Sequence, residues 1–242
     1  MHFVFLAAGK GTRIFSKIKT NKCLIKISNK TIIEKLIENI PENRRNKITI
    51  ATGFNSKNIF NKTKKFKVKY IHNSKYNTTD MVETLRIALE KIDDDIFFSY
   101  TDVIYERTII DRILKKNIIK ITVPINSAWK SVWKIRNKPI LKDAESLLIK
   151  NNNITEIGKK IKDIRNVHGQ FMGILIIPQI LRSKILKKLR NKKYKKYQTT
   201  RLLNTLIKDG FKVQAIKLKT HWYEFDDYHD LENYKKYYKI KN

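Results

Sequence analysis

The sequence predicts an α/β fold in which helices flank a mixed, mainly parallel sheet. Strand-like and helix-like patterns alternate from the first residues onward, which is typical of strand–helix–strand units. The first strand pattern, residues 3–6, is apolar throughout and ends at a glycine turn, as expected for a strand buried on both faces. An apolar content of 41% over 242 residues is enough to form a core, so global disorder is not expected.

The alternation is clearest in the first 125 residues. Short apolar runs that end in turn residues indicate strands, and apolar residues that recur every three or four positions indicate helices between them. Strand patterns occupy residues 3–6, 47–52, 68–71, 95–100 and 118–124, and helical patterns occupy residues 32–40, 55–62, 79–92 and 109–116.

The pattern changes after about residue 126. Residues 129–160 contain short strand-like pieces and turns, including three consecutive asparagines. Because no internal repeat and no Pro- or Ser-rich linker divides the chain, we predict a single domain over residues 1–242. Strand patterns follow at residues 171–177, 211–218 and 222–225, and helical patterns at 180–190, 199–208 and 231–238.

The net charge of +31 raises the hypothesis of a nucleic-acid partner. Of the 53 cations, 42 are Lys and only 11 are Arg, the residue that binds phosphates and guanine edges through two nitrogens. Lys, Ile and Asn make up 101 of the 242 residues, and because their codons are A/T-rich, a biased genome can raise all three. We therefore expect no specific nucleic-acid partner.

Cys23 is the only cysteine, which excludes an internal disulfide framework and suits a reducing compartment. No apolar run reaches membrane-spanning length, and the apolar start is too short for a signal peptide. We expect a cytoplasmic protein without a membrane partner, and formation of a homo-oligomer stays open.

The glycine-containing turn after the first strand is the most informative segment. Gly9 and Gly11 allow the backbone to come close to a ligand, while Lys10, Arg13 and the Thr12 hydroxyl add groups that bind phosphate. The spacing is neither that of a Walker P-loop nor that of the three-glycine dinucleotide fingerprint. The segment, which predicts a triphosphate cradle, reads Leu6-Ala7-Ala8-Gly9-Lys10-Gly11-Thr12-Arg13.

This segment resembles the signature of nucleotidyltransferases that join an NTP to a phosphorylated small molecule. They include the sugar-phosphate nucleotidylyltransferases and the phosphocholine cytidylyltransferases. Their pattern continues with a Pro-Lys-Pro-Leu-like turn, where this chain has Asn21-Lys22-Cys23-Leu24. The resemblance implies a Rossmann-like fold of the nucleotide-diphospho-sugar transferase type with a small acceptor-binding lobe. It also implies that Lys22, Lys10 and Arg13 are catalytic groups that hold phosphates.

Two aspartates resemble the metal ligands of these enzymes. Asp102 follows the strand pattern of residues 95–100, at a strand end where open α/β sheets bind ligands. Asp226 ends a Trp-x-Glu-x-Asp-like stretch before the last helix, and Asp227 is a competing candidate. Because Mg²⁺ prefers one or two carboxylates with phosphate oxygens and waters, we predict a magnesium site at Asp102 and Asp226.

The resemblance also implies which residues surround the nucleotide. Thr79 and Asp80 lie in a polar stretch that resembles the base-binding segment of the cytidylyltransferases, although Thr78 or Thr79 is also suited to capping the following helix. Asp80 stands where that branch carries Asn, and an ionised carboxylate only accepts hydrogen bonds. The predicted nucleotide-binding residues are Leu6, Ala7, Ala8, Gly9, Gly11, Thr12, Gly53, Thr79 and Asp80.

An acceptor site is implied by resemblance in the second half. Trp129 and Trp133 are four residues apart, which places them on one helix face, either as an acceptor wall or as core packing. The family aspartate before this element appears here as Asn126. The predicted acceptor-binding residues are Trp129, Trp133, Arg136, Glu145 and Lys159.

These features predict a nucleotidyltransferase with a nucleotide-binding half (residues 1–125) and an acceptor-binding half (residues 126–242). The expected reaction is Mg²⁺-dependent transfer of CMP from CTP to a small phosphorylated or phosphonate acceptor, with release of pyrophosphate. Transfer from UTP or dTTP to a sugar 1-phosphate is the first alternative. A basic nucleic-acid-binding module without chemistry is the second.

Overall fold

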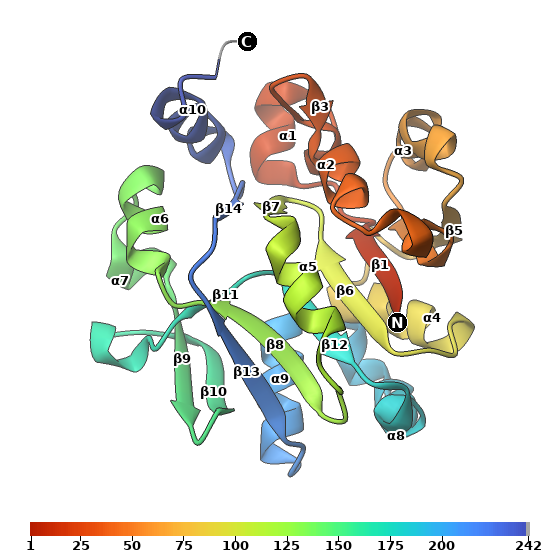
Figure 1. Cartoon of the computed structure of the whole chain (residues 1–242), viewed down its shortest axis with the longest axis vertical. Coiled ribbons are helices and arrows are strands. Elements are labelled where there is room, and N and C mark those ends of the chain that lie inside the picture. Colours follow the sequence, from red (N-terminus) through yellow and green to blue (C-terminus); the bar gives the residue numbers. More distant parts are fainter. Residues whose placement is uncertain (241–242) are drawn as a thin grey trace.

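The computed structural model describes residues 1–240, so the last two residues of the predicted domain lie outside it. The predicted fold class is confirmed: one mixed sheet runs through the molecule between helices (Figure 1). Its strands are β1 (His2–Ala7), β4 (Ile48–Thr52), β5 (Lys69–His72), β6 (Ile96–Tyr100), β8 (Ile121–Asn126), β9 (Glu145–Lys150), β10 (Asn153–Lys160), β11 (Gln170–Phe171), β12 (Ile174–Ile177) and β13 (Val213–Leu218).

The strand order is β5-β4-β1-β6-β12-β8-β13-β10-β9, with β11 beside β8. Strands β5, β4, β1 and β6 are parallel neighbours, and β8 is parallel to β13. Within this order, β12 and β10 run opposite to the other strands. The parallel part therefore brings the carboxyl ends of β1 and β6 to the same edge, where open sheets bind ligands.

Helices cover both faces of the sheet because alternate strand residues point to opposite sides. Phe3 and Phe5 of β1 belong to one buried cluster with residues of α2 and α5, whereas Val4 belongs to the other with residues of α4, α8 and α9. These helices are α2 (Ile32–Glu38), α4 (Met81–Lys91), α5 (Arg107–Leu114), α8 (Gln179–Leu189) and α9 (Thr199–Lys208).

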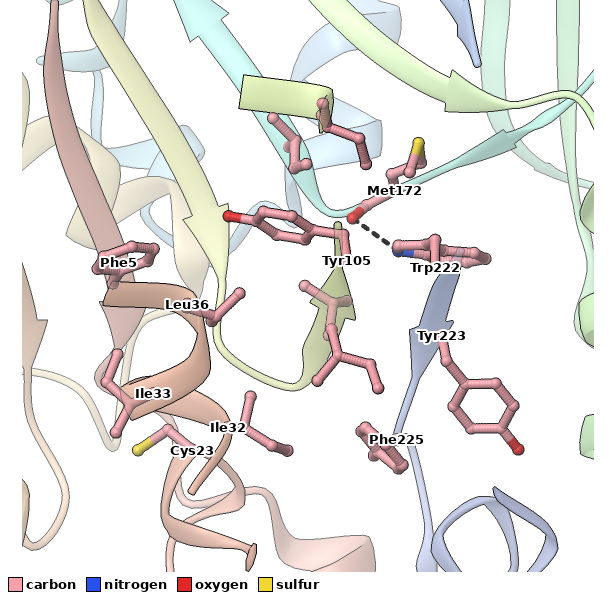
Figure 2. Close-up of a cluster of buried hydrophobic side chains, with 14 of the residues drawn as sticks. Phe5, Cys23, Ile32, Ile33, Leu36, Tyr105, Met172, Trp222, Tyr223 and Phe225 are labelled. Atoms are coloured by element: carbon pink, nitrogen blue, oxygen red, sulfur yellow. Dashed lines mark hydrogen bonds between the residues drawn. The ribbon is translucent and has the colours of Figure 1, made fainter. Parts of the chain in front are cut away.

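A small antiparallel sheet carries the chain back to the end of β6. It pairs β7 (Val103–Tyr105) with β14 (Trp222–Glu224). The Trp222 indole nitrogen donates to the Met172 carbonyl oxygen at 3.0 Å, and Phe225 packs into the same buried cluster (Figure 2). The Phe225 amide donates to the Asp102 carbonyl oxygen at 2.8 Å, so the residues after β14 are held beside Asp102.

Two segments differ from the sequence-based expectation. The strand predicted at residues 171–177 is broken at Gly173, whose φ of 72° turns the chain from β11, which pairs with β8, to β12, which also pairs with β6. Residues 129–160 hold two helices and a hairpin of β9 and β10 rather than only short strand-like pieces.

The remaining α-helices and short strands are α1 (Thr12–Ile18), β2 (Lys26–Ile27), β3 (Lys30–Thr31), α3 (Ser56–Thr63), α6 (Trp129–Arg136), α7 (Ile140–Asp143) and α10 (Tyr228–Tyr237).

The sheet is continuous across residue 125, and the functional division at that position stays a prediction. Among residues 1–240, no helix combines the length and the apolar character that crossing a membrane requires.

Candidate active site

A cavity of about 240 Å³ opens at the carboxyl ends of β1 and β6. The glycine turn after β1 and the N-terminal part of α4 contribute to its wall, and the acidic residues after β6 and in the β14 segment complete the lining. Its lining residues are Leu6, Ala7, Ala8, Gly9, Gly11, Arg13, Asn21, Lys22, Cys23, Asn73, Tyr76, Thr79, Asp80, Met81, Thr84, Tyr100, Thr101, Asp102, Glu224 and Asp226.

Two glycines are required by the close approach of neighbouring groups. Gly11 precedes α1 with a left-handed φ of 63°, and a Cβ atom there would lie 2.7 Å from Cγ of Lys22. At Gly53 a Cβ atom would lie 2.7 Å from both the Ala8 carbonyl oxygen and Cβ of Tyr76. Gly11 therefore leaves room for the Lys22 stem, and Gly53 lets the end of β4 pack against the turn after β1.

Lys22 connects the glycine turn to the acidic residues. Its side chain is 13% exposed, and its Nζ donates to Asp102 Oδ2 at 2.8 Å and lies 3.6 Å from Asp226 Oδ1. Burial lowers the pKa of Lys22, but the two carboxylates outweigh burial and raise its pKa above the ordinary value. The ammonium group therefore keeps its proton at neutral pH.

Three carboxylates meet at the end of the cavity. Asp102, Glu224 and Asp226 each offer an oxygen atom, and these oxygens lie within 4.8 Å of one another. Burial and the nearby charge of Asp226 raise the pKa of Glu224 well above its ordinary value. We name Asp102, Glu224 and Asp226 the carboxylate cluster.

Glu224 was not among the predicted metal ligands. The signal that could have found it is the two-residue spacing of Glu224 and Asp226 at a predicted strand end, because residues i and i+2 lie on one face of a strand.

Asp226 is held from two directions. Arg13 donates to its Oδ1 at 3.0 Å, and Arg136 donates to its Oδ2 at 3.1 Å. The competing candidate, Asp227, instead caps α10 through the Asp230 amide and pairs with Lys138 Nζ at 2.9 Å. These contacts favour Asp226 over Asp227 as the partner of Asp102.

The charges around the cluster do not balance. Six carboxylates and four cations are joined by ion pairs here, so acids outnumber cations in a chain whose net charge is +31. The acids are Asp102, Asp143, Glu224, Asp226, Asp227 and Asp230, and the cations are Arg13, Lys22, Arg136 and Lys138. This excess of carboxylate oxygens is suited to a divalent cation.

Most of the predicted nucleotide-binding residues line the cavity, but Thr12 and Gly53 are outside its lining, as is Lys10, which the sequence predicts to be catalytic. The Lys10 ammonium instead lies over the Phe15 and Phe54 rings, 5.2 and 5.5 Å from their centroids. The expectation that Thr78 or Thr79 caps the helix is replaced by Asp80, whose carboxylate accepts the Met81 amide at 2.7 Å. Lining residues that the sequence reasoning missed include Asn73, Tyr76 and Tyr100.

None of the five predicted acceptor-binding residues lines this cavity. Trp129 and Trp133 are buried and pack edge-to-face with ring centroids 5.4 Å apart, as the core-packing alternative expects. Burial raises the pKa of the Glu145 carboxyl, and Lys159 pairs with Glu156 at the surface. Arg136 is buried among carboxylates. Roles of these residues in acceptor binding stay predictions.

Comparison with known proteins decides the family. The MobA-like NTP transferase domain matches residues 3–152, which is more than half of the chain. The chain belongs to this family. It is therefore a nucleotidyltransferase, as the sequence predicts, and its relatives make it cytidylyltransferase-like.

One curated relative spans almost the entire chain. The CTP:phosphoglutamine cytidylyltransferase of Campylobacter jejuni subsp. jejuni serotype O:2 is 27% identical over 249 residues, which cover 96% of this chain and 98% of the relative.

Solved structures share the fold. The CTP:phosphocholine cytidylyltransferase of Streptococcus pneumoniae matches with a TM-score of 0.76 and 18% identity, covering 98% of each chain. The inositol-1-phosphate CTP transferase of T. maritima matches with a TM-score of 0.75 and 16% identity, covering 99% of this chain and 94% of the other.

Proposed function

We propose that this nucleotidyltransferase transfers CMP from CTP to a small phosphorylated or phosphonate acceptor, depends on Mg²⁺ and releases pyrophosphate. The observation that carries the proposal is the cavity in which a glycine turn, Lys22 and the carboxylate cluster face one another. Backbone amides and cations of this kind are suited to binding a triphosphate, and the carboxylates are suited to binding a divalent cation.

The residues of the cluster suit magnesium. Asp102 and Asp226, with Glu224 beside them, would hold the ion, because Mg²⁺ prefers hard oxygen donors. When bound, Mg²⁺ offsets negative charge on the phosphates that approach each other.

The side chains of this chain then position the reacting groups. An acceptor phosphate oxygen forms a bond to the α-phosphorus while the bond from that phosphorus to the pyrophosphate oxygen breaks. Lys22 and Arg13 donate to phosphate oxygens as charge redistributes, which is electrostatic stabilisation by groups already in place. A phosphate dianion is nucleophilic without a general base, so no residue has to remove a proton.

CTP is the favoured nucleotide for two reasons. The relative at 27% identity is named as a CTP-dependent enzyme and aligns over nearly its full length. In addition, Asp80 lines the cavity, and while its Oδ1 caps α4, its other oxygen can accept a hydrogen bond from the amino group that cytosine has and uracil lacks. A phosphorylated amide, the class named for that relative, is our first candidate acceptor.

Pyrophosphate release tests the proposal. The chain is incubated with each of CTP, UTP, dTTP and ATP against phosphorylated amides, phosphocholine, a phosphonate and sugar 1-phosphates, with and without Mg²⁺. We expect Mg²⁺-dependent release with CTP and one of the first three acceptor classes. Release with UTP or dTTP and a sugar 1-phosphate would establish the alternative, and no release with any pair would refute the catalytic proposal.

A further inference from the structure

Arg136 is buried where α6 meets the residues that follow β14. Its side chain is 1% exposed, and its Cζ atom lies 5.0 Å from the centroid of the Trp133 ring. Its Nη2 donates to Asp226 Oδ2 at 3.1 Å, and its Nη1 lies 3.7 Å from Glu224 Oε2. One guanidinium therefore contacts two of the three members of the carboxylate cluster.

These contacts oppose the repulsion inside the cluster. Carboxylates whose oxygens lie within 4.8 Å of one another repel strongly when partly withdrawn from water. Lys22 and Arg13 approach Oδ1 of Asp226, whereas Arg136 approaches Oδ2. The orientation of the Asp226 carboxylate is thus fixed by cations on both of its oxygens.

Asp230 fixes Arg136 in turn. This fully buried carboxylate accepts from Arg136 Nε at 3.0 Å and from Lys138 Nζ at 2.8 Å. It also accepts from the backbone amide of Asp226 at 2.9 Å. The guanidinium and the main chain of Asp226 are therefore anchored to the same group, which leaves the Asp226 side chain little freedom.

We infer that Arg136 is a positioning residue that holds Asp226 and Glu224 in the arrangement that receives the divalent cation. This inference rests on the proposed function, and it replaces the acceptor contact predicted for Arg136 from the sequence. All three guanidinium nitrogens lie within 3.7 Å of a carboxylate oxygen, the fourth acid being Asp143 at 3.4 Å from Nη1. Lysine cannot reproduce this, because a single ammonium lacks the planar fork.

The test compares Arg136→Lys with the wild type in the absence of nucleotide. Binding of Mn²⁺, which accepts the same oxygen ligands, is followed by the electron paramagnetic resonance signal of the free ion. We expect the dissociation constant for Mn²⁺ to rise about 10–100-fold in Arg136→Lys, the usual effect of removing a group that orients metal ligands. Circular dichroism and the melting temperature report whether the variant is folded.

Arg86→Lys is the matched control. Arg86 also binds two carboxylates through its guanidinium, Glu83 and Glu90, but on helix α4. We expect this variant to melt at a lower temperature and to bind Mn²⁺ as the wild type does. A purely structural role for Arg136 would make the two variants behave alike.

The outcomes distinguish the positioning role of Arg136 from the proposed nucleotidyl transfer. A folded Arg136→Lys protein with wild-type Mn²⁺ affinity would overturn the positioning role while leaving the proposed reaction intact. A wild-type chain that binds no Mn²⁺ would overturn the metal site and the positioning role together. If Arg136→Lys does not fold, Asp230→Asn keeps the arginine but loosens its anchor, and unchanged Mn²⁺ affinity in that variant would also refute the inference.

Discussion

The carboxylate cluster is held differently on its two sides. On the α1 side, Arg13 reaches Asp226 with a side chain that is 67% exposed, and Lys22 comes from a turn that lines the cavity. On the α6 side, Arg136 is buried and anchored by Asp230. Exposed ion pairs contribute only about 0–1 kcal/mol, so Arg13 can exchange Asp226 for phosphate, whereas a buried pair is costly to break. We therefore expect Arg13 to exchange Asp226 for a substrate phosphate, and Arg136 to keep its contacts with the cluster when substrate binds.

The largest effect is expected at the cluster itself, which both sides share. Asp102→Asn removes a charge next to Lys22 Nζ with almost no change in shape, and we expect pyrophosphate release to fall about 10²–10³-fold because charge stabilisation in the reaction is lost. Asp111→Asn, at an exposed ion pair on α5, is the control and should retain activity. Retention of turnover by Asp102→Asn in Mg²⁺ would remove Asp102 from the site.

A second test addresses the α1 side. Gly11→Ala places a Cβ atom 2.7 Å from the Lys22 stem at a left-handed φ of 63°, so we expect kcat/KM for the nucleotide to fall about tenfold, together with a loss of about 1–2 kcal/mol of stability. Gly210→Ala has a similar φ of 84° but no neighbour within 4 Å. Gly210→Ala should therefore lower the stability without lowering the activity. Equal activity in the two variants would show that Lys22 does not need the space that Gly11 leaves.

The packing of β1, the strand that precedes α1, depends on a neutral histidine. His2 in β1 hydrogen-bonds Thr49 in β4 at 2.8 Å, and burial lowers the pKa of His2 to about 4. Because the unfolded chain binds a proton near pH 6.5 and the folded chain near pH 4, the free energy of unfolding should fall as pH drops through this window, by about 1–2 kcal/mol between pH 7 and pH 5.

Urea unfolding at several pH values measures this effect. In His2→Gln this part of the pH dependence should disappear, while the slope between pH 7 and pH 8 should match the wild type. An identical acid slope in both proteins would contradict a neutral buried His2.

The smallest effect on catalysis is expected on the α6 side outside the cluster. Trp129→Phe should lower the free energy of unfolding by about 1–2 kcal/mol through lost packing against Trp133, and change kcat/KM for the acceptor less than about threefold. A large rise in KM for the acceptor would instead support the acceptor wall predicted from the sequence and would make the α6 side part of the binding surface.

How well the sequence predicts each part of the site depends on whether the residues of that part are close together in the chain. The glycine turn is contiguous with β1, so local sequence was enough to place Gly9, Gly11 and Arg13 at the cavity. Residues such as Asn73, Tyr76 and Tyr100 carry no local signal and reach the cavity because β5, β4, β1 and β6 lie side by side in the sheet in that order. The acceptor-side residues were placed by motif similarity, which does not report the direction in which a side chain points.

The sequence by itself determined the fold class, the glycine turn at the cavity and the candidate acids, because buried strands, glycine turns and strand-end aspartates are local patterns. Only the tertiary structure decided that Glu224 joins Asp102 and Asp226, and that Arg136 contacts Glu224 and Asp226 from a buried position. Asp102 and Asp226 are 124 residues apart and meet because β14 pairs with β7 just after β6. Such proximity depends on long-range strand pairing and on burial, which residue spacing along the chain does not specify.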